Sequence, residues 1–255
     1  MFTNNPFAEL AASIPPWAIQ TYVVLMVILV VAGTLIDVLH KKSAQYFFEN
    51  WRKSKTKGSK QLGGAKVASL AVQTAYSEVL TSSEFCNPRR RLAHLLTMYG
   101  FLAYVVTTAI MVFGYPTSAT PAPSIWPVLW HFGALMVCVG GYWFWFVIRV
   151  DVAAEGNSPF RVVRADLFIL SLLASATFAL IWSISQTTLF FGLYVVATTV
   201  LFAGVPWSKF AHMFFKPAAA LQKRVAEADG SRSNLPAPAD KPEVFGSVDR
   251  LPQNY

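Results

Sequence analysis

The stretch His94–Phe113, HLLTMYGFLAYVVTTAIMVF, decides the class of this protein. It contains no acidic residue, lysine or arginine, and an apolar run of this length crosses the hydrocarbon core of a bilayer as a helix. The triple arginine Arg89, Arg90, Arg91 stands just before it. Basic residues concentrate on the cytoplasmic side of membrane proteins, so the pattern predicts that His94 lies at the cytoplasmic end of a transmembrane helix.

The composition also indicates an integral membrane protein. Hydrophobic residues make up 55% of the 255 residues and charged residues only 13%, about half of the charged share in a soluble domain. The two cysteines, Cys86 and Cys138, lie in different segments and provide neither a four-thiolate iron–sulfur cluster nor a zinc spacing. The N-terminal residues lack the basic region of a cleavable signal peptide, so we expect the first apolar run to be retained as an anchor.

Four further apolar runs complete a predicted five-transmembrane-helix bundle. They cover about residues 17–39, 125–148, 165–184 and 188–205. The third span carries Trp126, Trp130, Trp143 and Trp145 near its ends, which is typical of an aromatic belt at the membrane surfaces. The sequence therefore predicts an all-α integral membrane protein with a membrane domain over 17–217.

The basic residues predict the orientation of this bundle. All 21 lysines and arginines fall in 41–91, 149–164 and 206–255, whereas the loops 114–124 and 185–187 have none. Five spans with this alternation place the N-terminus (1–16) in the periplasm and the C-terminus in the cytoplasm. The net charge of +8 then belongs to an inner membrane surface or a dock for an acidic partner, and nucleic acid is not needed to explain it.

Two segments extend outside the membrane. The cytoplasmic loop 40–92 contains a predicted amphipathic helix at Lys66–Phe85, with apolar residues at helical spacing on one face: Val67, Leu70, Ala71, Ala75 and Val79, with Thr74 beside them. The tail 218–255 is Ala/Pro-rich and charged. We expect it to begin as a short helix that reaches Ala228 and then to be largely disordered.

The chain has only four histidines. On the predicted topology His40, His94 and His212 lie at the cytoplasmic ends of spans one, two and five, and His131 lies near the outer end of span three. A pair of neutral imidazoles makes a good axial ligand set for haem iron, and His94 with His212 are placed to hold one haem. The alternative is that each histidine is an ordinary interfacial residue at a helix end.

The RRxxxH pattern before span two and PWSKFAH after span five resemble the haem b membrane subunits of the respiratory nitrate reductase gamma type. In that family spans two and five each carry two histidines, which together hold two stacked haems. The resemblance implies that His94 and His212 keep the inner pair, whereas the outer pair falls on Tyr104 and Tyr194. It therefore implies one haem b at most, on the inner side.

A closer resemblance covers nearly the whole chain. NPFAELAASIPP, LTSSEFCNPRRRLAHLLTMYGF and PWSKFAHMFFKPAAA are similar to the membrane anchors associated with dissimilatory adenylylsulfate reductase in sulfur-oxidising bacteria. This implies a multi-pass protein of the bacterial inner membrane. It also implies a cytoplasmic partner, the flavin and iron–sulfur enzyme that oxidises sulfite with AMP, whose electrons the anchor passes to quinone.

Arginines near the predicted inner surface are candidates for carboxylate contacts, because the guanidinium binds carboxylates with two hydrogen bonds. Arg161 and Arg164 lie in the loop 149–166 and are assigned to haem propionates or to a partner. The triple arginine Arg89–Arg91 is assigned to partner docking. The alternative for both groups is a solvated loop that only satisfies the positive-inside bias.

A quinone site needs hydrogen-bonding groups at an apolar cleft, and ionisable residues inside a span point to function. Asp37 and His40 lie about one turn apart at the inner end of span one and are expected on one side of the helix. His131 is the outer-side alternative. Ordinary capping or snorkelling groups remain the competing interpretation.

The leading interpretation is a membrane anchor and electron-transfer subunit that connects a cytoplasmic redox enzyme to quinone. The chain has no substrate-side catalytic constellation of its own: no nucleotide loop, no nucleophile triad and no flavin fingerprint. The alternatives are a purely structural haem-free anchor and a small-solute transporter. Transport is disfavoured because the sequence shows no internal repeat and few polar residues within the spans.

Overall fold

The computed structural model describes residues 2–40, 45, 47–49, 51–52, 60–83, 85, 87–149, 161–163, 166–205 and 212–231, with the side chains of 212–215 excepted. The described part is helical and contains no strand. Its elements are α1 (Pro6–Leu10), α2 (Pro16–His40), α4 (Gly64–Thr74), η1 (Ala75–Leu80), α5 (Pro88–Gly114), α6 (Ile125–Trp143), η2 (Phe144–Arg149), α8 (Leu167–Ser185), α9 (Thr188–Ala203) and α10 (His212–Ala228). The elements η1 and η2 are single π-helical segments that continue α4 and α6.

Four of these helices are long and apolar enough to cross a membrane: α2, α5, α6 with η2, and α8. A fifth apolar helix, α9, has only 16 residues and is about 24 Å long at 1.5 Å per residue. The chain is therefore an all-α, multi-pass membrane protein, as its sequence predicts. The helix bounds agree with the predicted spans to within a few residues, except that α5 begins at Pro88 and so includes the three arginines.

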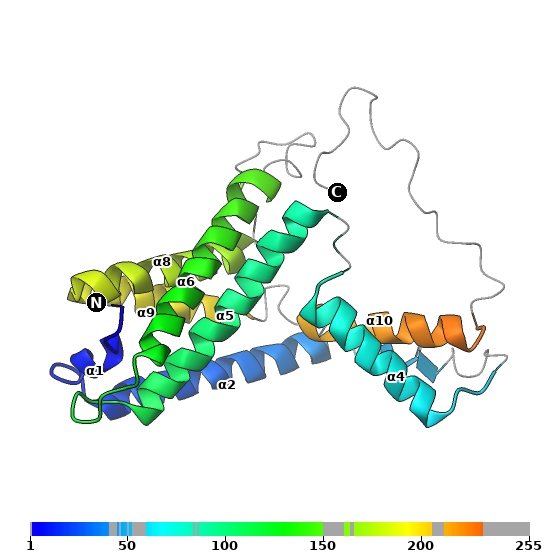
Figure 1. Ribbon diagram of the computed structural model, residues 1–255, viewed down its shortest axis with the longest axis horizontal. Helices are drawn as coiled ribbons and strands as arrows, with labels where there is room; N and C mark the ends of the chain where they lie inside the picture. Colours follow the sequence, from blue (N-terminus) through cyan, green and yellow to red (C-terminus); the bar gives the residue numbers. More distant parts are fainter. Residues whose placement is uncertain are drawn as a thin grey trace, which may run out of the picture.

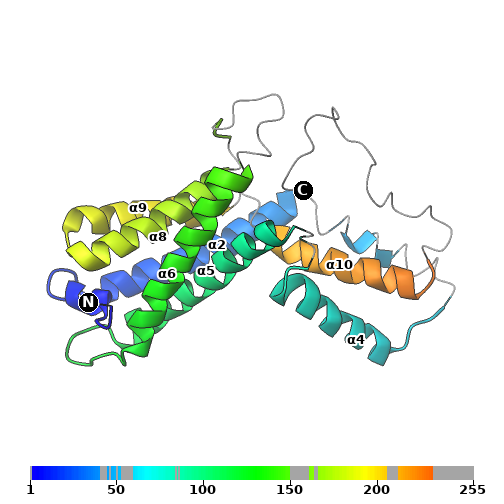
Figure 2. The same ribbon diagram turned by 45° about the horizontal axis from the view of Figure 1, so that its top comes forward.

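The bundle has two ends (Figure 1). One, the α1 end, carries α1 and the connections from α5 to α6 and from α8 to α9. The other, the basic end, is where α2 ends, α5 begins with Arg89–Arg91, and α10 starts. Helices α4 and α10 lie side by side beyond the basic end in both views (Figures 1 and 2). The sites considered below lie either in the bundle core or at this basic end.

Helices α5 and α6 pack through small residues. A β-carbon added to Gly133 would lie 2.8 Å from the Gly100 carbonyl oxygen and 2.8 Å from the Tyr104 amide nitrogen. One added to Gly140 would lie 2.7 Å from the Ala93 carbonyl oxygen. Such close backbone approach is how transmembrane helices gain van der Waals contact where lipid removes the hydrophobic driving force. This contact fixes the position of Tyr104 in the core.

The short helix α1 closes the α1 end. The Asn5 side chain caps α1 by accepting from the Phe7 amide at 3.0 Å, and it donates to the Tyr115 carbonyl at 2.8 Å. Phe7 is thereby held in the bundle, where it is only 4% exposed. A segment that the sequence places before the first span thus contributes to the core.

The predicted amphipathic helix is present as α4 and η1. Val67, Leu70, Ala71 and Thr74 are half-buried or buried, as expected, but Ala75 and Val79 are exposed. Ser77 and Glu78 are half-buried instead, because at about 100° per residue Glu78 falls near Val67 whereas Val79 falls about 120° away from it. The predicted short helix to Ala228 is also present, as α10.

Candidate functional site

His94 lies in the second turn of α5, on the surface at the basic end. Its ring contacts the Phe85 ring, with centroids 4.9 Å apart. The Arg90 guanidinium carbon lies 5.4 Å and the Lys216 ammonium nitrogen 5.3 Å from the centroid of the same ring. Because cations are attracted to an aromatic face, Phe85 joins the start of α5 to the first turns of α10.

The start of α5 follows from local sequence. Asn87 is the N-cap, and its side-chain oxygen accepts from the Arg89 amide at 2.9 Å, while Pro88 occupies the first helical position. The Arg91 Nε donates to the Thr81 carbonyl at 2.7 Å. The three arginines are therefore not equivalent: Arg89 is exposed, whereas Arg90 and Arg91 are half-buried and hold the preceding loop.

His212 is the first residue of α10, and its side chain lies outside the described residues. Lys216 follows it by about one helical turn and contacts Phe85, which contacts His94. The two histidines that the sequence pairs therefore begin or lie near the beginning of two helices that Phe85 connects. In residue type, two histidines with the cations Arg90 and Lys216 near one of them suit a haem with acidic propionates.

The outer pair of positions converges in the bundle core. Tyr104 on α5 and Tyr194 on α9 are 5% and 6% exposed. Their side chains are close enough to interact, and Ser175 on α8 lies beside the Tyr104 hydroxyl. The two tyrosines are far apart in the sequence, and only the resemblance paired them before the fold was known.

Aromatic side chains fill the space around these tyrosines. Tyr104 packs on Trp130 with centroids 5.4 Å apart, and Tyr194 stacks on Trp182 at 5.8 Å. Phe7 lies between the two indoles, 5.7 Å from Trp130 and 5.4 Å from Trp182. We call these five residues the aromatic cluster.

The aromatic cluster does not fit a haem. Both tryptophans are fully buried, and their side chains occupy the volume between the two tyrosines' helices. His131 contacts Trp130 with ring centroids 4.9 Å apart, but both of its ring nitrogens already have partners. The Trp182 Nε1 is buried without a hydrogen-bond partner among the described residues.

Trp130 and Trp145 differ from the predicted aromatic belt. Both are buried, and the Trp130 Nε1 donates to the Thr108 hydroxyl at 2.8 Å. The Arg149 guanidinium covers the Trp145 ring at 4.3 Å. These two side chains pack inside the bundle because helices on both sides of α6 cover them, which the periodicity of α6 does not reveal.

His131 is buried in the core. It is 6% exposed, its Nδ1 lies 2.7 Å from the Pro127 carbonyl oxygen, and its Nε2 lies 3.0 Å from the Ser183 hydroxyl oxygen. The carbonyl accepts only, so Nδ1 carries a proton. Both ring nitrogens are engaged, and this histidine ties α6 to α8.

Asp37 and His40 differ in their surroundings. Asp37 is buried on the inner face of α2 and takes part in an interaction with the chain, whereas His40 is exposed at the helix end. No direct contact joins the two side chains, both of which the structure describes. A shared site would therefore have to span a buried and an exposed position.

Arg149 has a partner that the sequence did not assign. Its guanidinium forms an ion pair with Asp166, with Nε 3.1 Å from Oδ1, and this pair bridges the end of η2 and the start of α8. Arg161 is exposed, while Arg164 lies outside the described residues. Among the described residues, no group of three or more His, Cys, Asp or Glu side chains is placed to hold a metal ion.

Sequence reasoning missed the contribution of Phe7, the pairing of His131 with Ser183 and the tie between α4 and α10. Only the aromatic content of the spans pointed toward the first. Comparisons of the chain with protein families, with curated proteins and with solved structures find no match. The functional conclusion therefore depends on the residues themselves.

Proposed function

We propose that this protein is the membrane anchor and electron-transfer subunit of a cytoplasmic redox enzyme, and that it connects this enzyme to the quinone pool. The proposed partner is adenylylsulfate reductase, which the resemblance of NPFAELAASIPP and PWSKFAH implies. The observation that supports this most is the convergence of Tyr104 and Tyr194 in the core. The resemblance treats these positions as a facing pair, and they face each other in the fold.

The proposed cofactor is one haem b, held by His94 and His212 at the basic end. Such a haem accepts and donates single electrons. In this proposal Arg90 and Lys216 offset the propionate charges, since both cations already lie around Phe85 beside His94. The quinone site is proposed near Asp37 and His40, because both belong to the same end of the bundle as His94.

The proposed topology has five spans, with α9 as the fifth, and a periplasmic N-terminus. Four longer apolar helices and the absence of lysine and arginine from 114–124 support it. A reporter fused after Tyr255 should behave as cytoplasmic, and one inserted in 114–124 as periplasmic. The reverse pattern would reject this orientation and with it the assignment of the basic end to the cytoplasm.

The haem is tested by a pyridine haemochrome assay on the purified full-length protein. We expect about one haem per chain, with loss of haem in both His94→Ala and His212→Ala. His40→Ala is the matched control, because His40 is also an exposed histidine at the basic end. Two haems per chain would refute the argument that the aromatic cluster does not hold a haem.

Partner docking is tested by sedimentation of purified adenylylsulfate reductase with proteoliposomes that contain the full chain. Arg89→Ala is the sharpest variant, because Arg89 is exposed while Arg90 and Arg91 support the fold. We expect weaker binding, and a greater loss at high salt because solvent-exposed charges are screened. If the wild-type protein does not retain the enzyme, this partner is wrong.

A haem-free anchor for the same enzyme is the second candidate. The contact between His94 and Phe85 favours it, because an interfacial histidine can pack in this way without any cofactor. Wild-type protein that retains adenylylsulfate reductase but contains no haem would establish this candidate. Electrons would then have to pass from the partner's own cofactors to a quinone held at the basic end.

A further inference from the structure

Helices α4 and η1 pack against α10, and we call this unit the helix pair. One apolar face of α4 and η1 does not contact α10. Val72, Tyr76 and Leu80 lie four residues apart along α4 and η1 and are 71%, 63% and 51% exposed. We call these three residues the outer stripe. The opposite face of the same helix is the one that contacts α10, through Thr74, Ser77 and Glu78 among others.

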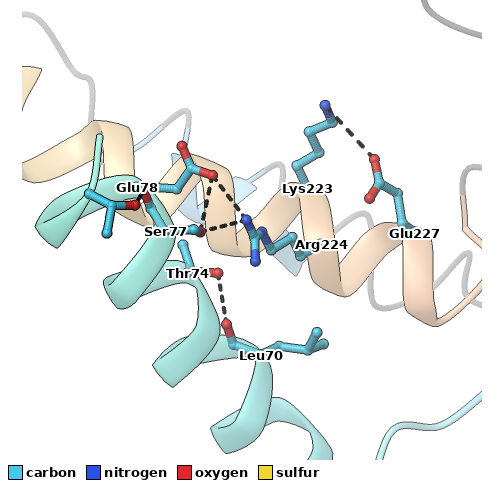
Figure 3. A network of polar contacts seen from close by, with 8 residues as sticks. Leu70, Thr74, Ser77, Glu78, Lys223, Arg224 and Glu227 are labelled. Carbon is cyan, nitrogen blue, oxygen red and sulfur yellow. Dashed lines mark hydrogen bonds and ion pairs between the residues drawn. The ribbon is translucent and has the colours of Figure 1, made fainter. Parts of the chain in front are cut away.

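Polar contacts at two places hold the helix pair together. The Arg224 guanidinium forms an ion pair with Glu78 at 3.0 Å and donates to the Ser77 hydroxyl at 2.7 Å (Figure 3). Farther along, the Lys60 amide donates to the Asp229 carbonyl at 3.1 Å. These contacts fix which face of α4 meets α10, and so they also fix the direction of the outer stripe.

Two faces of α4 and η1 have different surroundings. The backbone bonds of η1 include Thr81 amide to Tyr76 carbonyl at 3.0 Å and Ser83 amide to Ser77 carbonyl at 2.8 Å. Ser77 and Glu78 bond with Arg224, whereas Tyr76 and Leu80 are exposed together with Val72. Ser82, with φ of 47°, then ends the segment.

The outer stripe is continuous with the lipid-facing surface of α5. The Tyr99 hydroxyl donates to the Leu80 carbonyl at 2.7 Å. Tyr99 is exposed and lies on one face of α5 with further exposed apolar residues at helical spacing, Leu92, Leu102 and Val106. A transmembrane helix turns such a face toward acyl chains, so the stripe begins where the bilayer surface meets α5.

The direction of α4 agrees with this placement. In both views α4 runs steeply across the direction of α5, with α10 on one side of it (Figures 1 and 2). A helix that leaves a transmembrane helix in this manner lies along the membrane surface. The side chains of Lys60 and Lys66 are exposed, which suits contact with anionic headgroups.

We infer that α4 and η1 form an interfacial helix whose outer stripe enters the headgroup region of the bilayer at the basic end, with α10 carried on its other face. The occupant of the stripe is the lipid surface. Tyrosine is common at this depth, and the absence of charge from the stripe matches an amphipathic helix that lies in the interface. This inference does not depend on the proposed electron transfer.

The test uses nitroxide labels on the full chain in nanodiscs that contain anionic lipid. Labels are placed at Val72→Cys and Tyr76→Cys after Cys86 and Cys138 are replaced by alanine. Lys223→Cys is the matched control, because Lys223 is an exposed residue of α10 in the same helix pair. We expect oxygen to relax the stripe labels more than a water-soluble nickel complex does, and the reverse at 223.

Equal nickel access at all three positions would overturn the inference, since the stripe would then face water. Protection of 72 and 76 only after addition of purified adenylylsulfate reductase would also overturn it, because the stripe would then bind protein. Tyr76→Glu in the Val72→Cys background should increase nickel access at 72 if lipid covers the stripe. No increase would count against lipid contact.

Discussion

Replacement of Gly133 by alanine tests the packing that holds the bundle core. The added methyl group would lie 2.8 Å from the Gly100 carbonyl oxygen, 2.8 Å from the Tyr104 amide nitrogen and 3.1 Å from the Ala103 β-carbon. Two of these three neighbours are backbone atoms, which cannot rotate out of the way. Helices α5 and α6 must therefore separate, and Tyr104 must move within the aromatic cluster.

The expected magnitude follows from two opposing effects. Overpacking of a tight contact costs about 1–3 kcal/mol, whereas replacing a helical glycine by alanine contributes at most about 1 kcal/mol. Because backbone atoms cause the clash, we expect a net loss of about 1–2 kcal/mol. For a domain of this size that lowers Tm by about 2–8 °C.

Gly192→Ala is the matched control. Gly192 lies inside α9, is exposed, and an added β-carbon there meets nothing within 4 Å. Alanine at 192 should leave Tm unchanged or raise it. Thermal unfolding of both variants in the same detergent, followed by circular dichroism, measures the difference. A Gly133→Ala protein as stable as the wild type would refute the close packing of α5 on α6.

Three further outcomes follow from the contacts. Phe7→Ala should lose about 3 kcal/mol or more, because it leaves a cavity between two indoles, whereas Phe2→Ala, at an exposed residue, should not; equal Tm values would show that α1 is not part of the core. Ser183→Ala should cost about 1–3 kcal/mol, because a buried imidazole loses its partner, and an unchanged Tm would contradict this. A double-mutant cycle on Arg224→Ala and Glu78→Ala, measured by chemical unfolding, should give a coupling of roughly 0.2–1 kcal/mol, since the pair is partly exposed, and a coupling below this range would contradict the contact between α10 and η1.

The sequence by itself determined the elements and their class. A long run without acidic residue, lysine or arginine, such as His94–Phe113, must be helical in a bilayer because every backbone group needs an internal partner. The bounds of α2, α6 and α8 were predictable for that reason, whereas α5 begins at Pro88, before the apolar run. The sorting of lysine and arginine into three segments likewise follows from composition alone, although the orientation that it predicts awaits the reporter experiment.

The tertiary structure decided which residues meet. The apolar spans give almost no facing signal, since a helix with apolar residues all round can turn any side toward its neighbours. Trp130 therefore looked like a belt residue and is fully buried, and His131 looked like a surface candidate and is paired with Ser183. Phe7 enters the core only because Asn5 ties α1 to the end of α5.

The same reason separates the two halves of the candidate site. The convergence of Tyr104 and Tyr194 requires α5 and α9 to pack around shared aromatic residues, which no local pattern encodes. Ala75 and Val79 were assigned to the buried face of the predicted helix, but at about 100° per residue they lie at its edge and beyond it. The local sequence thus determined the helices and their charges. Contacts between residues distant in sequence decided the core, the helix pair and its outer stripe.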